Sequence, residues 1–519
     1  MSVSPLKLNN IISRLEQLSW LVSWPLFSFV AGTLTTLAFA PFELSWLVFV
    51  TLALAFYYWH RLPLKQAVIS GWLFGLGLQC TGVSWIYFSL HVHGSAPAFF
   101  AALTIFLLSA CLALFTAMAV YIVNRYLLDK QILRLLVFYP ASWVLLEWFQ
   151  GYALTGFAWM QLGYTQIDLP LSGFAPVFGN HAVSGFIAVS AGALVFLYKQ
   201  GKNLHGEGIN YKLLISVLIP VVVLWPAGYL LKSINWTEID GEPIKVSVIQ
   251  GNIAQKDKWK PYMKQPTLDI YRNLSLAQKD VDLIVWPETA VPDYRYRAAP
   301  YIEKLRHELA APDTDLLLGI FVKDENQRVL NSVININGGV YNKRHLVPLG
   351  EYIPLRFLVE FFNRFVRIPM SDIISGDEDQ PLLIGGGVPL GISICFEDAF
   401  SREVNRDLPE AKLLVNVSND AWFEDSIQPH QHHAIARMRA LETGRYMIRS
   451  TNTGITSFID PHGEVIKQLP QFEVGVLNGE VLPYVGSTPF VRWGNWLVVG
   501  LCSLLLLGFA VFKKSKAKN

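Results

Sequence analysis

The charged side chains of this chain are distributed so unevenly that the chain is predicted to fold in two different solvents. It contains 42 Lys and Arg and 40 Asp and Glu in 519 residues, but only 17 of these side chains lie in residues 1–232. The other 65 lie in residues 233–519. We expect the first part to lie in lipid and most of the second part to fold in water around its own core.

The overall composition excludes several classes of protein. The chain is 52% hydrophobic and 16% charged, whereas soluble domains are about 25% charged. Disordered, collagen-like and disulfide-scaffold proteins have other compositions. The formal net charge of +2 provides no basic surface for nucleic acid, so no nucleic-acid partner is expected.

Eight segments are apolar enough to cross a membrane, for which a helix needs about 20 apolar residues. The predicted spans are 20–41, 43–59, 66–90, 97–123, 131–150, 178–198, 213–231 and 493–512. The fifth contains Pro140 and Glu147, and a glutamate at that depth must face the protein interior or the interface. The predicted domains are a membrane domain at 1–232 with seven spans, a water-exposed domain at 233–492, and the eighth span with a basic tail at 493–519.

The positions of Lys and Arg predict the orientation of these spans, because such residues collect in short cytoplasmic loops. With the N-terminus inside, every cytoplasmic stretch carries Lys or Arg, and the three short loops on the other side carry none. Both termini are therefore predicted to be cytoplasmic. The 233–492 domain is predicted to lie outside the cytoplasm.

A reporter fused after residue 260 tests this orientation. We expect an enzyme that matures only outside the cytoplasm to be active there, and one that works only inside to be inactive. The opposite pattern would contradict the predicted topology.

The loop from Trp148 to Asn180 is apolar and aromatic, but Gly and Pro interrupt it throughout. It is too broken for a plain helix. An interfacial or re-entrant segment that lines a lipid-access cleft is one interpretation, and a hydrophobic loop packed under the soluble domain is the other. The sequence alone leaves both open.

Beyond Lys232 the pattern changes to short β-branched runs separated by turns and polar helical stretches. The predicted strands are 244–250, 282–286, 316–322, 331–336, 391–394, 413–417 and 454–459. Strands that alternate with helices indicate a layered α/β fold with buried sheets.

One thiol stands alone in this second part. Of four cysteines, Cys80, Cys111 and Cys502 fall in predicted spans, where a cysteine is usually a small apolar side chain. Cys395 ends the apolar run at 391–394 and has no disulfide partner in its domain. It is either buried and inert, or kept for chemistry.

The ends of other runs supply what a reactive thiol needs. Glu288 follows the strand 282–286, and a polar stretch between Tyr341 and Pro354 carries Lys343 and Glu351. A thiol attacks as the thiolate, so it requires a base for its proton and a cation that favours the charge. Glu288, Lys343 and Cys395 are therefore candidate catalytic residues.

Three phrases, WPET (286–289), YNKRHLVPLGEYIP (341–354) and SICFEDAF (393–400), resemble the catalytic motifs of the nitrilase superfamily. Further segments are similar to those of the bacterial apolipoprotein N-acyltransferases, a membrane-embedded family of that superfamily. These segments are QGNIAQKDKW (250–259), SNDAWF (418–423), ARMRALETGR (436–445) and RSTNTGIT (449–456).

The resemblance implies an αββα sandwich on a multi-pass α-helical membrane domain and the last step of lipoprotein maturation in the inner membrane. An acyl chain would pass from a phospholipid, such as phosphatidylethanolamine, through a Cys395 thioester to the α-amino group of an apolipoprotein's diacylglyceryl cysteine. The same resemblance implies that Cys395 is the nucleophile, Glu288 the general base and Lys343 the group that stabilises the oxyanion. Residues implied to bind substrate or support the triad are Glu351, Trp259, Phe396, Glu397 and Asn331. Position 396 departs from many members, which have Tyr there, so a packing role is retained and a hydroxyl role is not.

The stretch 352–370 combines large apolar side chains with Arg356, Arg364 and Arg367. It is interpreted as a lid at the membrane surface that excludes water from the thioester, or otherwise as a helix of the domain. His430, His432 and His433 lack companions at zinc-like spacing, so no metal and no cofactor are expected.

Two alternatives to the acyltransferase come from the residues themselves. A membrane-tethered amidase of the same superfamily would use water as acceptor, but it leaves seven spans unexplained. A transporter or receptor would need ion-binding residues at mid-membrane, and the spans have almost none. A monomer would suffice for the two-step transfer.

Overall fold

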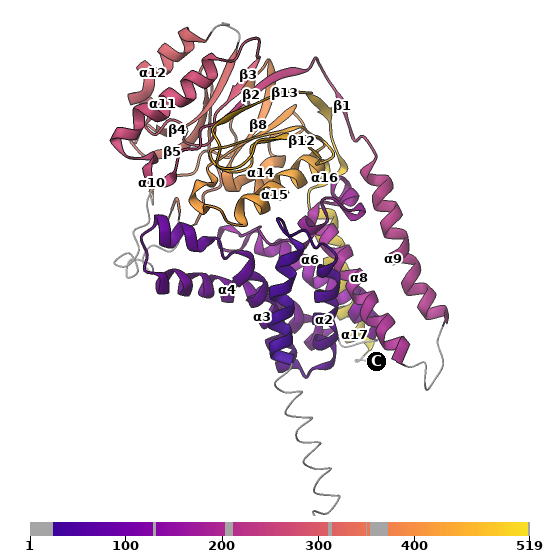
Figure 1. Cartoon of the computed structure of the whole chain (residues 1–519). Helices are drawn as coiled ribbons and strands as arrows, with labels where there is room; N and C mark the ends of the chain where they lie inside the picture. The colour runs from indigo at the N-terminus through magenta and orange to yellow at the C-terminus, as the bar shows by residue number, and fades with distance from the viewer. Residues whose placement is uncertain are drawn as a thin grey trace, which may run out of the picture.

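The computed structural model describes residues 24–127, 131–202, 211–309, 314–348, 350–352 and 372–516. Apolar helices form the lower part of the molecule, and a strand-rich domain stands on them (Figure 1). The chain enters this domain after α9 (Tyr211–Lys232) and leaves it through α17 (Trp496–Lys516). The stretch predicted as a lid, 352–370, lies outside the described residues apart from Tyr352.

The lower part is built from helices of different lengths. They are α2 (Leu47–Arg61), α3 (Leu64–Gly82), α4 (Ala98–Tyr126), α5 (Gln131–Leu133), α6 (Tyr139–Gln150), α7 (Ala175–Phe178), α8 (Asn180–Lys202) and α9. Short 3₁₀ or π turns connect them: η1 (Thr36–Ala38), η2 (Phe88–His93), η3 (Arg134–Phe138), η4 (Ala153–Thr155), η5 (Leu162–Gln166) and η6 (Pro170–Phe174).

Within the described residues, four helical stretches are long and apolar enough to cross a membrane: 98–126, 131–150, 180–200 and 214–232. They coincide with four of the eight predicted spans. Of the other predicted spans, the first begins outside the described residues, and the second falls on the 15 residues of α2. That helix is about 22 Å long against a hydrocarbon core of about 30 Å. Eight crossings therefore stay a prediction.

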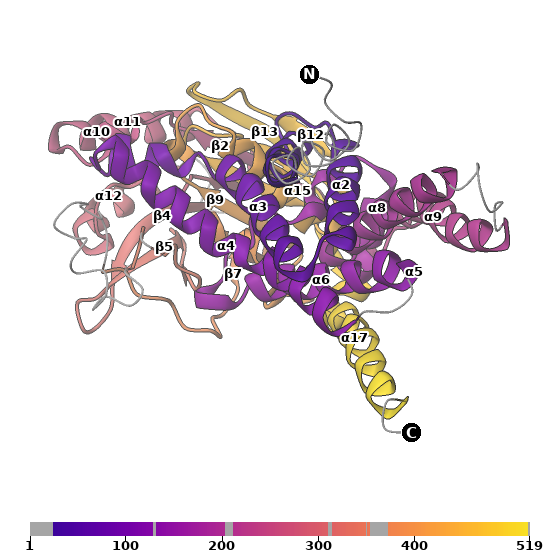
Figure 2. The same cartoon turned by 90° about the horizontal axis from the view of Figure 1, so that it is seen from below.

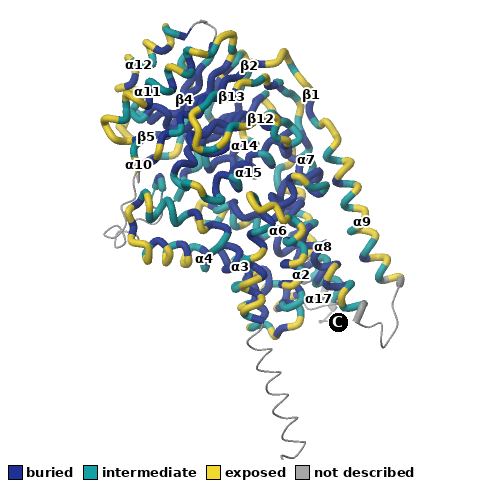
Figure 3. Tube along the Cα trace, viewed as in Figure 1, coloured by how far each residue is buried: buried dark blue, intermediate teal, exposed yellow. Residues whose placement is uncertain are grey.

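Many residues of the apolar helix α9 are exposed (Figure 3). Only 11% of its most apolar window is buried, and Ile219, Val222 and Leu230 are each more than half exposed. Such a surface would be unstable in water and is stable against lipid tails.

Glycines allow α3 and α4 to pack closely. A Cβ atom on Gly71 would lie 2.7 Å from Val120, and one on Gly75 would lie 2.9 Å from Thr116. Small residues at such contacts let two apolar helices approach without a hydrophobic driving force between them. Both helices cross beneath the strand-rich domain when the molecule is seen from below (Figure 2).

The structure places the two unusual residues of the fifth predicted span where they are tolerated. Pro140 lies in the first turn of α6, where a proline has no hydrogen bond to lose. Glu147 is directed into the protein, where it accepts hydrogen bonds from Trp143 Nε1 (3.3 Å) and Leu162 N (2.9 Å). This confirms that its carboxylate faces the interior.

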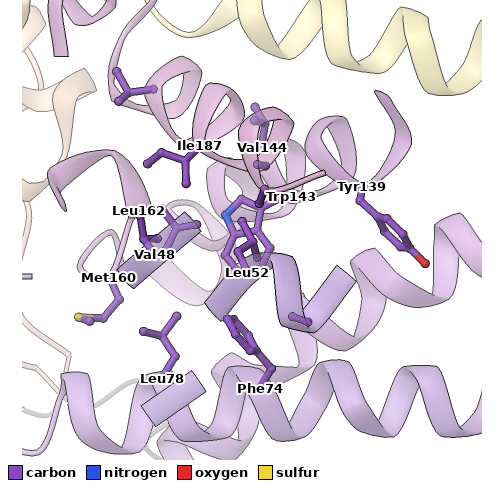
Figure 4. Close-up of a cluster of buried hydrophobic side chains, with 14 of the residues drawn as sticks. Val48, Leu52, Phe74, Leu78, Tyr139, Trp143, Val144, Met160, Leu162 and Ile187 are labelled. Carbon is purple, nitrogen blue, oxygen red and sulfur yellow. The ribbon is translucent and has the colours of Figure 1, made fainter. Parts of the chain in front are cut away.

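The loop after α6 is packed between the two parts of the molecule. Met160 and Leu162 point into the helical core together with Leu52 and Phe74 (Figure 4). At the end of the loop, the backbone N–H of Asn180 donates to Oε1 of Glu442, a buried carboxylate of the upper domain (2.7 Å). Of the two interpretations of this loop, the structure therefore supports a hydrophobic loop packed under the soluble domain.

The upper domain contains two six-stranded sheets. One has the order β13-β2-β3-β4-β5-β6 and the other has the order β12-β11-β10-β9-β8-β7. The strands of the first are β2 (Ile244–Gln250), β3 (Leu283–Val285), β4 (Asp315–Lys323), β5 (Val329–Asn335), β6 (Val340–Asn342) and β13 (Gly475–Val481). Those of the second are β7 (Leu383–Gly385), β8 (Val388–Ile394), β9 (Leu413–Ser418), β10 (Met447–Thr451), β11 (Ser457–Ile459) and β12 (Val465–Gln468).

Helices cover the outer face of each sheet, so the domain has four layers. They are α10 (Gln255–Lys258), α11 (Pro261–Leu276) and α12 (Arg295–Glu308) with the first sheet, and α14 (Ser401–Asn405) and α15 (Gln428–Thr443) with the second. The ribbon β1 (Thr237–Ile239) and β14 (Tyr484–Gly486), with α16 (Pro489–Trp493), leads to the membrane helices. Successive side chains of a strand point to opposite faces of its sheet. On β9, Val415 and Val417 therefore face the first sheet, whereas Leu414 packs against α15.

One hydrophobic cluster runs through both parts of the molecule. It joins side chains of the helical part, such as Trp159 and Leu162, to Phe396, Phe400 and Met438 of the upper domain. The two parts therefore share a core, and the α15 layer of the sandwich rests on the membrane helices (Figure 1).

A substitution at Gly228 of α9 tests the close packing of this helix against η6. A Cβ atom on Gly228 would overlap the carbonyl oxygen of Pro170. We expect Gly228→Ala to lower stability by about 1–3 kcal/mol, seen as a lower melting temperature in detergent. Gly500→Ala is the control, because a Cβ there meets nothing within 4 Å. Equal melting temperatures of the two variants would contradict the close contact.

Candidate active site

The candidate catalytic residues lie at the ends of strands from both sheets. Glu288 follows β3 and Lys343 follows β6 in the first sheet, whereas Cys395 follows β8 in the second. The backbone N–H of Asn419, just after β9, donates to Glu288 Oε2 at 2.9 Å. Since β9 lies parallel to β8, this bond brings the cysteine end of the second sheet to the glutamate end of the first.

Lys343 is the centre of a buried ion cluster. Its Nζ lies 2.9 Å from Glu351 and 3.8 Å from Glu288, and its side chain is 1% exposed. Asn331 Nδ2 donates to both carboxylates, at 2.8 Å to Glu288 and 3.1 Å to Glu351. A buried ammonium group is stable only when it is paired in this way.

The electrostatics of the site determine the protonation states of Lys343 and Cys395. Burial alone would lower the pKa of Lys343, but Glu351 and Glu288 outweigh it and raise that pKa above its usual value, so the ammonium stays charged. Burial, followed by the charge of Glu288, raises the pKa of the Cys395 thiol well above its usual value of 9, against the opposing effect of Lys343. The thiol therefore holds its proton at neutral pH and needs a base.

Glu397 ties the segment that carries the ammonium to the strand that carries the thiol. Its Oε1 accepts from the backbone N–H groups of Arg344 (2.6 Å) and His345 (3.0 Å). Its Oε2 accepts from Ile394 N (2.6 Å) and from the Tyr341 hydroxyl (3.1 Å). Burial raises the pKa of Glu397 to about 7. This side chain orients its neighbours and lies behind the cluster.

Cys395 itself has a backbone conformation that non-glycine residues seldom adopt. Its φ is +53°, at the point where β8 ends and the turn η9 (Cys395–Ala399) begins. A left-handed conformation at such a residue costs about 1–3 kcal/mol, and it persists where the surroundings enforce it. The sharp turn points the side chain away from the strand direction.

The two aromatic candidates lie on different sides of the site. Phe396 is buried and stacks on Trp159, with ring centroids 5.9 Å apart, so it faces the membrane part. Trp259 is 40% exposed and stacks on Phe321 at 5.5 Å. Among the described interactions, Trp259 has no hydrogen bond or ring contact with Glu288, Lys343 or Cys395.

The sequence patterns did not single out Lys258. It is buried, and its Nζ donates to the Glu288 carbonyl (3.2 Å) and to Thr289 Oγ1 (2.7 Å). Burial lowers its pKa to about 7. Because Lys258 lies among charged residues in the sequence, its pattern is that of a solvated surface, and only the fold reveals that it supports the glutamate.

A half-buried Cys beside a buried Glu and a buried Lys, at the edge of an αββα sandwich, defines a carbon–nitrogen hydrolase type of domain, here built on apolar helices. Residues 245–490 match the family model described as carbon-nitrogen hydrolase, and residues 31–193 match the apolipoprotein N-acyltransferase N-terminal domain. The chain belongs to the apolipoprotein N-acyltransferase family.

Similar proteins cover nearly the whole chain. An apolipoprotein N-acyltransferase of Methylococcus capsulatus is 40% identical over 482 residues, which are 92% of this chain and 94% of that protein. One of Pseudomonas paraeruginosa is 41% identical over 496 residues, 93% and 95% of the two chains. The solved C. elegans NitFhit protein is 19% identical with a TM-score of 0.36, over 48% of this chain and 62% of that chain. The full-length relatives support an acyltransferase and not the amidase alternative.

The raised pKa of the thiol leads to a test of Glu288. We expect Glu288→Gln to slow acylation of Cys395 about 1000-fold at pH 7, because general-base catalysis typically contributes 10²–10⁴-fold. The residual acylation rate of Glu288→Gln should rise steadily from pH 7 to 10. Without Glu288, only hydroxide from solution removes the thiol proton, and its concentration rises with pH. Acylation is measured by intact mass. A variant whose rate does not change with pH would contradict the role of base.

Proposed function

We propose that this enzyme moves an acyl chain from a phospholipid to the α-amino group of the N-terminal diacylglyceryl cysteine of an apolipoprotein. Membership of the family over more than nine-tenths of the chain carries this proposal. The placement of the site supports it, since the turn at Cys395 shares a core with apolar helices. A phospholipid ester lies at the membrane surface, where that core ends.

The first half of the reaction forms a thioester. Glu288 accepts the Cys395 proton, and Sγ attacks the ester carbonyl carbon of the phospholipid. The charge that develops on the carbonyl oxygen is stabilised by the Lys343 ammonium in a water-poor site. The carbon–oxygen bond breaks, and the lysophospholipid leaves with the proton held by Glu288.

The second half transfers the acyl chain to nitrogen. The amine attacks the thioester carbon, and Glu288 accepts the amine proton, because an ammonium group cannot attack. The carbon–sulfur bond breaks, Sγ takes the proton back from Glu288 so that Cys395 is regenerated, and an amide forms. Glu351, Asn331 and Glu397 support the triad, while Phe396 and Trp259 border the space for substrate. The chemistry is complete without a metal or a cofactor.

The proposed organisation follows the sequence. The membrane domain covers 1–232 with seven spans, the catalytic domain covers 233–492 in the periplasm, and 493–519 holds the eighth span and a cytoplasmic tail. Both termini are cytoplasmic in the inner membrane, and a monomer carries out both steps.

Intact mass of the purified protein tests the proposal. After exposure to phosphatidylethanolamine, we expect an acyl-sized, hydroxylamine-labile increase on the wild type and none on Cys395→Ala. A diacylglyceryl-cysteine peptide should then remove the increase and gain the acyl chain on its amine. Loss of the increase to water alone would indicate a hydrolase, and folded wild type without any increase would contradict the triad.

A further inference from the structure

A buried cluster of charged side chains lies beneath the turn that carries Cys395, and the acyl transfer described above does not use it. It contains one residue from each of four elements, each at most 1% exposed. They are Asp398 of η9, Asp420 of η10 (Asp420–Phe423), His432 of α15 and Arg449 of β10.

The four side chains form a closed ring of alternating charge. His432 Nε2 lies 2.8 Å from Asp398 and its Nδ1 lies 3.2 Å from Asp420. Arg449 reaches the second oxygen of each carboxylate, at 3.4 Å from Asp398 and 3.2 Å from Asp420. A neutral imidazole has one N–H, so only the imidazolium donates to both carboxylates.

Charge balance leads to the same protonation state. Two carboxylates and one guanidinium would leave a buried negative charge without a partner, which is costly in a protein interior. A protonated His432 makes the ring neutral. Burial and Arg449 act to lower the pKa of His432, but Asp398 and Asp420 outweigh them and raise it.

The ring is connected to the cysteine backbone. The Cys395 carbonyl accepts from His432 Nε2 at 3.2 Å, through the same N–H that Nε2 donates to Asp398 at 2.8 Å, and from Asn416 Nδ2 at 3.3 Å. Asn416 is itself held, because its Oδ1 accepts from Arg449 at 2.7 Å. Two buried donors on one carbonyl fix the peptide plane that follows Cys395. They supply the enforcement that its left-handed conformation requires.

Two tryptophans of the membrane part pack beside the charged ring. The Trp159 ring lies 5.4 Å from the His432 ring, and its Nε1 donates to Gln431 at 2.7 Å. Trp85, from the segment after α3, donates to the same Gln431 oxygen at 3.1 Å. An indole beside an imidazolium also stabilises the positive charge.

We propose that His432 is a positioning residue for acyl transfer. As an imidazolium shared by Asp398 and Asp420, it holds the Cys395 carbonyl and thereby keeps the thiol in place for Glu288 and Lys343. It does not touch the substrate. This inference rests on the proposed function, because it concerns the rate at which the thioester forms.

Two neutral substitutions separate this role from simple charge balance. In His432→Gln the amide nitrogen lies near the position of Nε2, so a donor to Cys395 remains. In His432→Asn the amide nitrogen lies near the position of Nδ1. The donor to Asp420 therefore remains, and the donor to the Cys395 carbonyl is lost. Both variants remove the same charge. His433→Asn is the matched control on the same helix, since His433 bonds to Ser457 Oγ (2.9 Å) and lies outside the ring.

The rate of thioester formation on the full-length protein with phosphatidylethanolamine is measured by intact mass, with the melting temperature alongside. We expect His432→Asn to lower kcat about 100-fold, the effect of a misplaced reacting group, and His432→Gln about 10-fold. The KM for phospholipid should change less than about twofold in both, because His432 is not in contact with lipid. His433→Asn should keep the wild-type rate.

Equal losses in the Gln and Asn variants would overturn the proposal, because they would show that only the charge matters. A wild-type rate in His432→Asn would also overturn it. Asn416→Ala removes the second donor without changing the charge. We expect it to slow acylation about 10-fold, and an unchanged rate would overturn the proposal. A wild type that forms no thioester would contradict the proposed function instead.

Discussion

The ion cluster around Lys343 is the interaction on which the active site depends. An ammonium group at 1% exposure requires partners, and here Glu351 at 2.9 Å, Glu288 at 3.8 Å and the bridging Asn331 provide them. The cluster carries one positive and two negative charges. Burial first, and then the charge of Glu288, raise the pKa of the nearby Cys395 thiol against the opposing effect of Lys343, so the thiol stays protonated. On the proposed mechanism, the reaction begins with a proton that moves from Cys395 to Glu288 inside the site, so no charge enters or leaves a region where solvation is poor.

This arrangement explains why the triad is divided between two sheets and why buried side chains behind it are needed. Glu397 accepts hydrogen bonds from both the 341–345 segment and the end of β8, so the positions of ammonium and thiol are coupled. Glu397 sets the distance between the sheets' ends, and the ring around His432 supports the cysteine turn from the opposite side. Phe396 then joins this turn to Trp159, so the membrane helices support the site directly.

The sequence predicted those parts of the structure that depend on local pattern. The β-branched run 244–250 is a strand with the same bounds, and Glu288 and Cys395 each follow a strand as expected. Lys343 follows the short strand β6, which the sequence pattern did not predict. Patterns in one short segment could not show contacts between distant ones. Trp159 reaches Gln431, and His432 reaches Asp398, only because the layers fold together. The predicted strand at 454–459 is shorter, 457–459, because Gly454 forms a bend and Ile455 and Thr456 are in no regular element. The roles of the site residues and the eight crossings stay predictions.

The competition between an amine and water places a further demand on the site. A base that accepts a proton from an amine can also accept one from water, so Glu288 alone does not select the acceptor. Selection then has to come from exclusion of water and from a high local concentration of the amine. The rings of Phe396, Phe157 and Trp159 form an apolar wall beside the cysteine turn. An acceptor anchored in the same bilayer diffuses in two dimensions at the level of that wall. On the proposed function, the shared core of the two domains therefore serves selectivity, because it keeps the thioester at the depth where lipid-anchored amines are abundant and water is scarce.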